Sequence, residues 1–497
     1  MKRILTAKEM SGADAYTIET IGIPSEVLME RAALAVFREI KKRKLDTLRT
    51  LIVCGSGNNG GDGAAVARLL AEEGLIPDVL MLGNPEKCSA QLKMQLRALE
   101  YYDVNYVSDI EDDKYDLIID AIFGIGLSRD IAGAAADVIK KINAQTAYKV
   151  SVDVPSGIEG STGHVRGIAV KADLTVTFAC AKIGHFIYPG AMYSGETVVA
   201  NVGIPAEKIV ANGSIYHIED SDIKNLPKRD EYGNKATFGK LLVIAGSANI
   251  CGAAYFAAAS ALRIGAGMVK ILTSSQNRSA LSILAPEALI DTYDEECDES
   301  KLEAALSWAD GVVIGPGLGT GDISVDIFNK FIELNNKHRL YTVMDADALN
   351  IIASDENYWS RIGFDCAVTP HIGEMSRLVN APPADIKADP IKFASDLAAK
   401  HSIVCVMKDA VTVTSYPDDR SYINTSGCSA LATAGSGDVL SGIIGGMMVS
   451  HRKVQLPLEA YAVHMHGRLG ESAARRHSAS SVTAGMLIEE MCCKTEY

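Results

Sequence analysis

Hydrophobic residues in the first part of the chain form short runs, separated by longer segments in which apolar and polar positions alternate with helical spacing. Short apolar runs divided by helix-length segments are typical of βαβ units and of a parallel sheet that is buried on both faces. The pattern predicts strands at Leu48–Cys54, Ile76–Leu82, Tyr115–Ala121, Tyr148–Val154 and Leu174–Phe178, and a helix over Ala64–Glu73.

The alternation stops at Ser221–Thr237, a polar segment that contains Pro227 and Gly233, and then restarts. Polar segments with Pro and Gly are typical of domain boundaries. The second part predicts strands at Lys240–Ala245, Met268–Thr273, Gly311–Ile314, Leu340–Met344, Cys366–Thr369 and Ile403–Lys408, with helices over Gly252–Ile264 and Val439–Val449. We therefore expect two α/β domains, residues 1–220 and 221–497.

Composition narrows the function. The chain has 497 residues, 48% of them hydrophobic, and a net charge of −14. This hydrophobic content favours a packed protein over a disordered one, and the negative charge disfavours a nucleic-acid polymer as partner. There is no apolar run of 18 residues and no apolar segment typical of a signal peptide, so we expect a cytoplasmic protein without a membrane partner. The ten cysteines show no C-x-x-C pair and hence no zinc pattern.

A glycine-rich segment, Gly55–Gly63, follows the first strand and precedes a helix. Gly55, Gly57 and Gly60 fit G-x-G-x-x-G, the fingerprint of dinucleotide-binding oxidoreductases. The acidic residue expected at the end of the second strand is missing, which weakens a hydride-transfer function. Repeated glycine still allows a phosphate to approach the backbone. The oxygens of Asn58, Asn59 and Asp62 suit a cation, although such residues also simply form turns.

Three polar side chains follow later strands of this half: Asp120, Asp153 and Ser156. Ligands of open α/β sheets bind at the carboxyl ends of the strands, so these residues are expected to meet in one crevice. Lys182 would add a positive charge there. The alternatives are that Asp120 and Ser156 only cap helices and that Lys182 is solvated.

In this order, the segments NNGGDG, DAIFGIGL and SVDVPSG, followed by a Lys before a Gly, resemble the NAD(P)H-hydrate epimerase domain over about Met1 to Tyr216. The resemblance implies a Rossmann-like three-layer α/β/α sandwich that binds hydrated NADH or NADPH, and a K+ ion held by Asn59, Asp120 and Ser156. The implied substrate contacts are Asn58, Asn59, Gly60, Gly61, Asp62, Gly124, Ile125, Gly126, Leu127, Ser128, Arg129, Asp130 and Asp153. For acid–base catalysis we favour Asp153, helped by Lys182.

The second half lacks a Walker-type motif and instead carries Ala434-Gly435-Ser436-Gly437-Asp438 before an apolar helix. Small residues at a helix N-terminus form an anion hole for a phosphoryl group, and an Asp there can take the proton of an attacking hydroxyl. This predicts Asp438 as a catalytic base. The alternative is that Asp438 only stabilises the helix, just as His371 in isolation would more often be structural.

The series IGPGLG, DADALN, TPHIGEM, KDAVT and AGSGDVLSG resembles the NAD(P)H-hydrate dehydratase domain over about Asp222 to Glu490. The resemblance implies a ribokinase-like α/β fold. Its substrate contacts would fall on Ala254, Gly317, His371 and Asp438, and its nucleotide contacts on Lys408, Asp409, Ala410, Val411, Thr412 and Gly437. The segment Asn424–Ala432 departs from the family pattern, which puts the loop over the nucleotide in doubt.

Together, the two resemblances imply a bifunctional repair enzyme. Its second domain would phosphorylate the C6 hydroxyl of the hydrated ring with ADP or ATP and Mg2+, and phosphate would then be eliminated. Its first domain would interconvert the R and S epimers, of which only S is dehydrated. We also expect a homo-oligomer. Three alternatives stay open: a ribokinase-like small-molecule kinase with a nucleotide-sensing first domain, a pure binding module, and a hydride-transfer enzyme.

Overall fold

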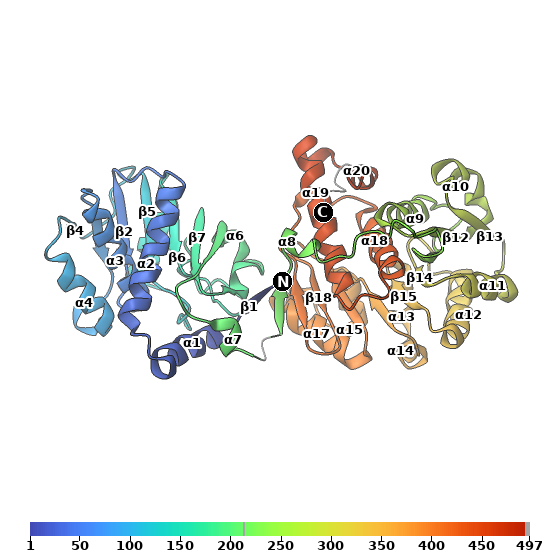
Figure 1. Cartoon of the computed structure of the whole chain (residues 1–497), viewed down its shortest axis with the longest axis horizontal. Helices are drawn as coiled ribbons and strands as arrows, with labels where there is room; N and C mark the ends of the chain where they lie inside the picture. Colours follow the sequence, from blue (N-terminus) through green and yellow to red (C-terminus); the bar gives the residue numbers. More distant parts are fainter. Residues whose placement is uncertain (212–213, 493–497) are drawn as a thin grey trace. The chain divides into compact units, whose positions relative to one another are not determined.

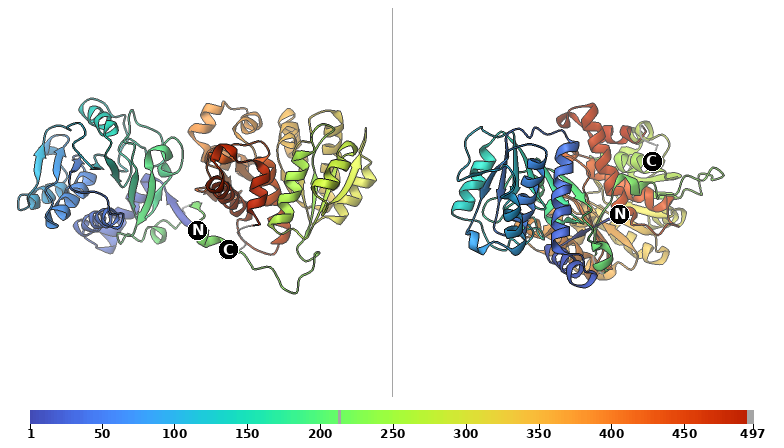
Figure 2. Two further views of the ribbon diagram at one scale, coloured as in Figure 1. Left: turned by 90° about the horizontal axis from the view of Figure 1, so that it is seen from above. Right: turned by 60° about the vertical axis from the view of Figure 1, so that its left-hand side comes forward.

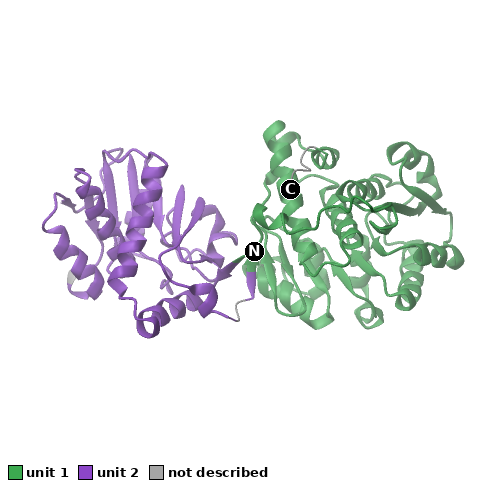
Figure 3. Cartoon of the chain, in the orientation of Figure 1, with its two compact units in different colours: residues 1–2, 216–497 green, residues 3–215 purple. Residues whose placement is uncertain are grey.

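The computed structural model describes residues 1–211 and 214–492, so the last five positions of the predicted second domain lie outside it. The chain divides into two compact units, Arg3–Ile215 and Met1–Lys2 with Tyr216–Tyr497 (Figure 3). The passage from one unit to the other after Ile215 lies close to the predicted boundary. None of the helices in the described residues is long and apolar enough to cross a membrane.

In the first unit, the described residues form a parallel seven-stranded sheet of order β4-β3-β2-β5-β6-β7-β9 (Figure 1). The strands are β2 (Thr50–Cys54), β3 (Asp78–Met81), β4 (Asn105–Val107), β5 (Leu117–Ala121), β6 (Tyr148–Val152), β7 (Leu174–Phe178) and β9 (Glu196–Ala200). From β2 the chain continues through β3 to β4 at one edge of the sheet, and from β5 it continues through β6 and β7 to β9 at the other edge. The strand order therefore reverses between β2 and β5, and ligands of open α/β sheets bind at such a point.

Helices cover both faces of this sheet. The helices are α2 (Ser25–Lys42), α3 (Asn58–Glu72), α4 (Ala90–Leu99) and α5 (Ala134–Ala144). Alternate strand residues face opposite sides, as the pleat requires. Ile52 packs with α2, α3 and α4, whereas Leu51 and Val53 pack with Ile139 of α5. The predicted three-layer sandwich is confirmed.

Two smaller elements of the first unit come from distant parts of the sequence. The helix α1 (Ala7–Tyr16) follows the short strand β1 (Lys2–Leu5), which pairs in parallel with β8 (Ala181–Lys182). Leu5 lies opposite Lys182 in this pairing. The N-terminal segment is thereby held next to Lys182, which the sequence pattern did not predict.

The second unit is built on another parallel sheet, in which β13, β12, β11, β14, β15, β16 and β17 are neighbours in this order. Helices flank the strands of this unit (Figure 2). The antiparallel β18 (Val413–Ser415) and β19 (Ser421–Ile423) follow β17. The parallel strands are β11 (Lys240–Ile244), β12 (Met268–Ser274), β13 (Leu289–Tyr293), β14 (Gly311–Ile314), β15 (Tyr341–Met344), β16 (Cys366–Val368) and β17 (Val404–Met407). The main helices are α9 (Gly252–Ile264), α11 (Glu299–Trp308), α12 (Asp322–His338), α15 (Ile372–Val379), α17 (Pro390–His401), α18 (Ser436–Ser450) and α19 (Leu458–Arg476).

The helices α9 and α18 pack closely because α18 presents glycines to α9. A Cβ atom on Gly442 would lie 2.1 Å from the Ser260 hydroxyl, and one on Gly446 would lie 2.4 Å from Ile264. Neither contact leaves room for a side chain. The same helix packs on the sheet through Gly445, where a Cβ would lie 2.5 Å from Val313. This packing fixes the start of α18, where Asp438 lies.

The largest difference from the sequence prediction is at the start of α3. The pattern predicts a glycine-rich loop followed by a helix from Ala64, but the helix already begins at Asn58. Glycine disfavours helices by only about 1 kcal/mol per residue, and here packing decides. A Cβ on Gly60 would lie 2.0 Å from the Gly55 carbonyl oxygen, and one on Gly61 would lie 2.5 Å from the Met29 side chain. The glycines let the first turn of α3 approach β2 and α2.

Candidate functional site

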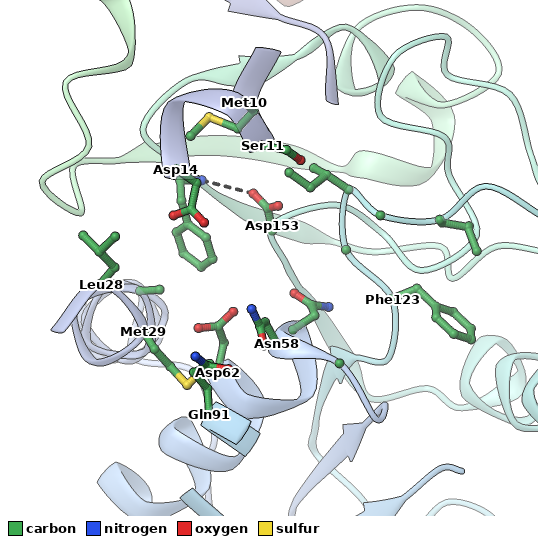
Figure 4. Close-up of a pocket in the computed structure, with 18 of the residues that line it drawn as sticks. Met10, Ser11, Asp14, Leu28, Met29, Asn58, Asp62, Gln91, Phe123 and Asp153 are labelled. Carbon is green, nitrogen blue, oxygen red and sulfur yellow. Dashed lines mark hydrogen bonds between the residues drawn. The ribbon is translucent and has the colours of Figure 1, made fainter. Parts of the chain in front are cut away.

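The first unit contains a cavity of about 580 Å3 at the point where the strand order reverses. The segment after β2 and the segment after β5 line it, together with residues of α1 and α2 (Figure 4). Its wall combines apolar side chains such as Leu28 and Met29 with carboxylates and amides. A cavity of this size, with polar groups that converge on it from several elements, is typical of small-molecule sites.

Lys182 and Asp153 form a buried ion pair on this cavity. The Lys182 side chain is 1% exposed, and its ammonium donates to Asp153 Oδ1 at 2.6 Å, to Thr177 Oγ1 at 2.7 Å and to the Phe178 carbonyl at 3.1 Å. All three donors of the ammonium are therefore satisfied. Burial acts to raise the pKa of Asp153, but the Lys182 charge and hydrogen bonds outweigh it, so the pKa lies below its ordinary value. Asp153 is thus an ionised carboxylate in a low-dielectric site.

The backbone of Asp153 is in the left-handed region, with φ of +66°. A residue other than glycine pays of order 1 kcal/mol for this conformation, and such outliers gather at functional sites. The strained residue is held by hydrogen bonds from its own N–H to the Val176 carbonyl and between its carbonyl and His185 Nε2 at 2.9 Å. Burial lowers the pKa of His185 to about 4, so this ring is neutral near pH 7. The surrounding structure therefore fixes the Asp153 carboxylate in place.

Two further carboxyl groups face the same cavity, Asp62 of α3 and Asp14 of α1 (Figure 4). Burial raises the pKa of Asp62 well above its ordinary value, and the charges of Asp153 and Asp14 add to this effect. Burial also raises the pKa of Asp14. Asp62 was predicted from the sequence, but Asp14 was missed. Its only local signal is a position on the polar side of a short helix, which does not distinguish it from a solvated residue.

The structure brings most of the predicted substrate contacts together, but not all. The residues of that set that line the cavity are Asn58, Asn59, Asp62, Gly124, Ile125, Gly126, Leu127, Ser128, Arg129 and Asp153. Gly60, Gly61 and Asp130 are not among the lining residues. Gly60 and Gly61 are buried within the first unit, where they let α3 pack.

The three predicted cation ligands lie beside this cavity. Asp120 is fully buried and accepts four hydrogen bonds, from Ser151 Oγ at 2.8 Å, from the Ser156 hydroxyl at 2.5 Å and N–H at 2.8 Å, and from the Ile122 N–H at 3.3 Å. Among the described residues it has no positively charged partner. The Asn59 amide nitrogen is buried without a hydrogen-bond partner in the described structure. A buried carboxylate without a counter-charge suits a monovalent cation, and of the Asn59 amide only the oxygen could ligate one, because the nitrogen is a hydrogen-bond donor.

In the second unit, Asp438 lies in the first turn of α18, which begins after Gly435 at φ of +86°. Burial raises the pKa of Asp438 to about 7, and the nearby charge of Asp345 adds to the rise while that of Lys408 opposes it. A carboxyl group with a pKa near the working pH is suited to general base catalysis. The preceding Ser436 is buried and bonds to His466 Nε2 at 3.2 Å.

Lys408 and Asp345 form a second buried ion pair, close to Asp438. Lys408 Nζ donates to Asp345 Oδ1 at 2.7 Å, and the Ser441 hydroxyl donates to Asp345 Oδ2 at 2.6 Å. Asp345 follows β15 and Lys408 follows β17, while Ser441 belongs to α18. A Cβ on Gly437 would lie 3.4 Å from Lys408 Nζ, so the lysine reaches the start of α18 directly. Asp345 stands at a strand end in the sequence, but its sequence context alone indicates no role.

His371 and Glu374 occupy the next strand end. His371 begins α15, where its side chain accepts from the Gly373 N–H, and the Glu374 carboxylate accepts from the His371 N–H at 2.8 Å. Backbone pairing places His371 next to Lys408. Burial raises the pKa of Glu374 to about 7. His371 therefore has the structural role of a helix cap, and its exposed ring is also free to meet a ligand.

The remaining predicted contacts differ in accessibility. Gly317 follows β14 at φ of +59°, and a Cβ there would lie 2.7 Å from Ile250, so only glycine fits. The Ala254 side chain is fully buried in the core, which leaves only its backbone for a ligand. The turn between β17 and β18 holds the predicted nucleotide contacts Lys408, Asp409, Ala410, Val411 and Thr412, of which Asp409 and Ala410 are exposed.

Known proteins resemble both units. A family model described as NAD(P)H-hydrate dehydratase matches residues 241–492, and a model described as the N-terminus of YjeF-related proteins matches residues 25–184. The bifunctional NAD(P)H-hydrate repair enzyme Nnr of Moorella thermoacetica is 35% identical over 516 aligned positions, which cover 98% of this chain and 95% of the relative. The chain belongs to the bifunctional NAD(P)H-hydrate repair enzyme family. The Escherichia coli member is 31% identical over 89% of this chain and 84% of its own length.

Among solved structures, the second unit is similar to the ADP/ATP-dependent NAD(P)H-hydrate dehydratase of Bacillus subtilis, co-crystallised with ATP and Mg2+. The two are 27% identical, the match covers 56% of this chain and 96% of that one, and the TM-score is 0.49. Family membership confirms the predicted bifunctional epimerase and dehydratase, and it favours this function over a small-molecule kinase with a sensing domain.

Proposed function

We propose that the first unit interconverts the R and S epimers of hydrated NADH and NADPH in the cavity around Asp153, and that the second unit dehydrates the S epimer at the start of α18. One observation carries this proposal. The chain, which is related to repair enzymes over nearly its whole length, contains one site in each unit, and each site has a Lys–Asp ion pair at the carboxyl ends of its strands. Each residue role in these two sites is part of the proposal.

Dehydration needs a better leaving group than hydroxide. With its pKa near 7, Asp438 would take the proton of the C6 hydroxyl, and the oxygen would attack the terminal phosphoryl group of ADP or ATP. The N–H groups at the start of α18 would stabilise the transferred group. Elimination of phosphate with a proton from C5 then restores the reduced ring. The relatives' names do not say whether ADP or ATP is the phosphoryl donor. We favour ADP, because the fusion of the two domains in one chain resembles the prokaryotic form of the enzyme.

Epimerisation inverts C6, the ring carbon that carries both the hydroxyl and the ring nitrogen. A carbon with these two substituents opens to an aldehyde when the hydroxyl loses its proton, and it can close again from the other face. Asp153 is ionised, fixed and open to the cavity, so it is suited to accept that proton. Lys182 keeps Asp153 ionised and acts through it as a positioning residue.

Two ions complete the proposal. Asn59, Asp120 and Ser156 would hold K+, which would neutralise the buried Asp120 carboxylate next to the substrate phosphates. Mg2+ would accompany the phosphates of ADP or ATP. Glu374, whose pKa burial raises to about 7, forms no ion pair with a lysine among the described residues, so its carboxyl group would be left to ionise when Mg2+ binds beside it. Mg2+ supplies charge neutralisation on the phosphates when bound. We also propose a homo-oligomer in the cytoplasm.

Paired substitutions test the division of labour. In Asp438→Asn, nucleotide-dependent repair of the S epimer should fall by about 10²-fold to 10⁴-fold, because a general base is lost, while epimerisation continues. In Asp153→Ala the reverse is expected. Each variant serves as the folding control for the other. Loss of both activities in both variants, or of neither, would contradict the proposed roles.

The products of the reaction distinguish a repair enzyme from a small-molecule kinase. Repair releases inorganic phosphate and restores the near-ultraviolet absorbance of the reduced nicotinamide ring. A stable phosphorylated product that accumulates without this absorbance would instead favour a small-molecule kinase.

A further inference from the structure

Asp62 is a carboxyl group on the cavity of the first unit, and its hydrogen bonds and neighbouring charges differ from those of Asp153. Asp62 lies on α3, on a different element from Asp153, and both side chains face the cavity (Figure 4). Asp153 accepts hydrogen bonds from Lys182 and Thr177. The Asp62 side chain forms no hydrogen bond or ion pair with another described residue.

The neighbours of Asp62 favour its neutral, protonated form. The apolar side chains of Leu28 and Met29 from α2 line the same cavity, and the nearby titratable groups are Asp14, Asp153 and the buried Cys54 thiol. None of these can neutralise a second negative charge. Lys182 has already given all three donors to Asp153, Thr177 and Phe178. A carboxyl group without donors among carboxylates is expected to keep its proton.

Resting on the proposed epimerase function, we propose that Asp62 is the proton donor that acts opposite the base Asp153 during epimerisation. The hydroxyl proton at C6 passes to the Asp153 carboxylate, and the C6–oxygen bond becomes a carbonyl. The C6–nitrogen bond breaks, its electron pair stays on the ring nitrogen, and that nitrogen takes the proton of Asp62. Rotation about the C5–C6 bond presents the other face, and the reverse transfers close the ring with both carboxyl groups restored. No other reactant is consumed.

Asp62 is the acid and Asp153 the base because their different surroundings give the two carboxyl groups different pKa values. Other enzymes with paired carboxyl groups separate the two roles in the same way. The raised pKa of Asp62 and the lowered pKa of Asp153 agree with the assignment. Asp78, a buried carboxyl group of the first unit that is not among the residues lining the cavity, provides the matched control.

The test uses the full chain and the purified R epimer of hydrated NADH, with the R and S forms separated by chromatography over time. In Asp62→Asn we expect kcat for epimerisation to fall by about 10²-fold or more, with KM changed little, because the amide fills the same space but cannot donate a proton. Asp78→Asn should retain most of kcat, because Asp78 does not line the cavity. Urea unfolding compared with the wild-type chain reports that the first unit of each variant is folded, and dehydration of the S epimer reports the same for the second unit.

Asp62→Ala adds a readout that a structural role would not move. Its activity should be restored in part by formate or acetate added at a pH where the acid form is present, since these small acids fit the space left by the carboxyl group. Unchanged kcat in Asp62→Asn, or loss of activity in Asp62→Ala that neither acid restores, would overturn the assignment. If the wild-type chain itself does not speed epimerisation, the proposed function fails instead.

Discussion

Lys182 and Lys408 stand in the same relation to a strand-end carboxylate in the two units. Each donates to an aspartate, Lys182 to Asp153 at 2.6 Å and Lys408 to Asp345 at 2.7 Å; the Lys182 side chain is 1% exposed and that of Lys408 20%. Taken alone, a single lysine or aspartate in the sequence is more often solvated than catalytic. The order of the motifs placed Asp153 and Lys182 in one site, whereas no motif paired Asp345 with Lys408. Lys182 lies 29 positions from Asp153 in the chain, and Lys408 lies 63 positions from Asp345. Only the sheet topology brings each lysine to its aspartate.

Removal of Lys182 tests the first pair. In Lys182→Met, the Asp153 carboxyl would lose its buried partner, which typically costs about 3–5 kcal/mol. Urea unfolding should show the loss, and epimerisation should fall because Asp153 no longer stays ionised.

The control for this variant is Lys149→Met. Lys149 is also buried in the first unit, but its ammonium donates only to the Gln145 and Ala147 carbonyls. This variant should lose stability and keep epimerisation. Equal loss of activity in both variants would mean that stability, and not the Lys182–Asp153 pair, explains the effect.

The Lys408–Asp345 pair affects how the rate of dehydration depends on pH. Asp438 acts when ionised and its pKa lies at about 7, so the dehydration rate should rise with pH through this value. Lys408 lowers the pKa of Asp438, so Lys408→Met should move the rise to higher pH. The kcat of dehydration, measured against pH with purified S epimer and saturating ADP or ATP, checks this shift. A rise that stays in place or moves to lower pH would contradict the role of Lys408.

At the scale of elements, the apolar pattern was a good guide to the buried parallel strands and a poor one to the rest. The predicted strands of both halves are found, with ends that differ by one or two residues for most of them, and α9 has the predicted bounds. The short β1, β8, β10 (Ile215–His217), β18 and β19 were missed, because two to four residues carry no measurable periodicity. The parallel strands β4, β9 and β13 were missed as well, because they lie at the ends of the strand order, are partly exposed and therefore lack a continuous apolar run. The early start of α3 was missed because close packing, which local sequence does not encode, overrides the low helix propensity of glycine.

Gly60 at the start of α3 and Gly126 after β5 provide a matched pair of Gly→Ala substitutions. Gly60→Ala would place a Cβ 2.0 Å from the Gly55 carbonyl oxygen, so we expect destabilisation of about 1–3 kcal/mol or more. Gly126 follows β5 in the first unit, and a Cβ there would meet nothing within 4 Å, so Gly126→Ala should change stability little. Thermal or urea unfolding checks both. Equal stability of the two variants would contradict the packing argument.

For the whole molecule, the sequence motifs predicted more than composition did. The net charge of −14 argues only against a nucleic-acid polymer, whereas the two motif series by themselves indicate both activities. The geometry added what the motifs lacked: the Asp14 and Asp62 carboxyl groups in one cavity, and the Asp345–Lys408 pair beside Asp438. Such contacts join residues from distant segments, so no local pattern contains them.

The central claim is that one chain carries out two consecutive repair steps. It is tested most directly by supplying the purified R epimer of hydrated NADH with ADP or ATP and following reduced-ring absorbance together with inorganic phosphate. We predict that the full chain converts the R epimer completely to NADH, faster than spontaneous epimerisation allows, with equal release of phosphate. Consumption of the R epimer no faster than its spontaneous epimerisation, or a stable phosphorylated product in place of NADH, would contradict the account.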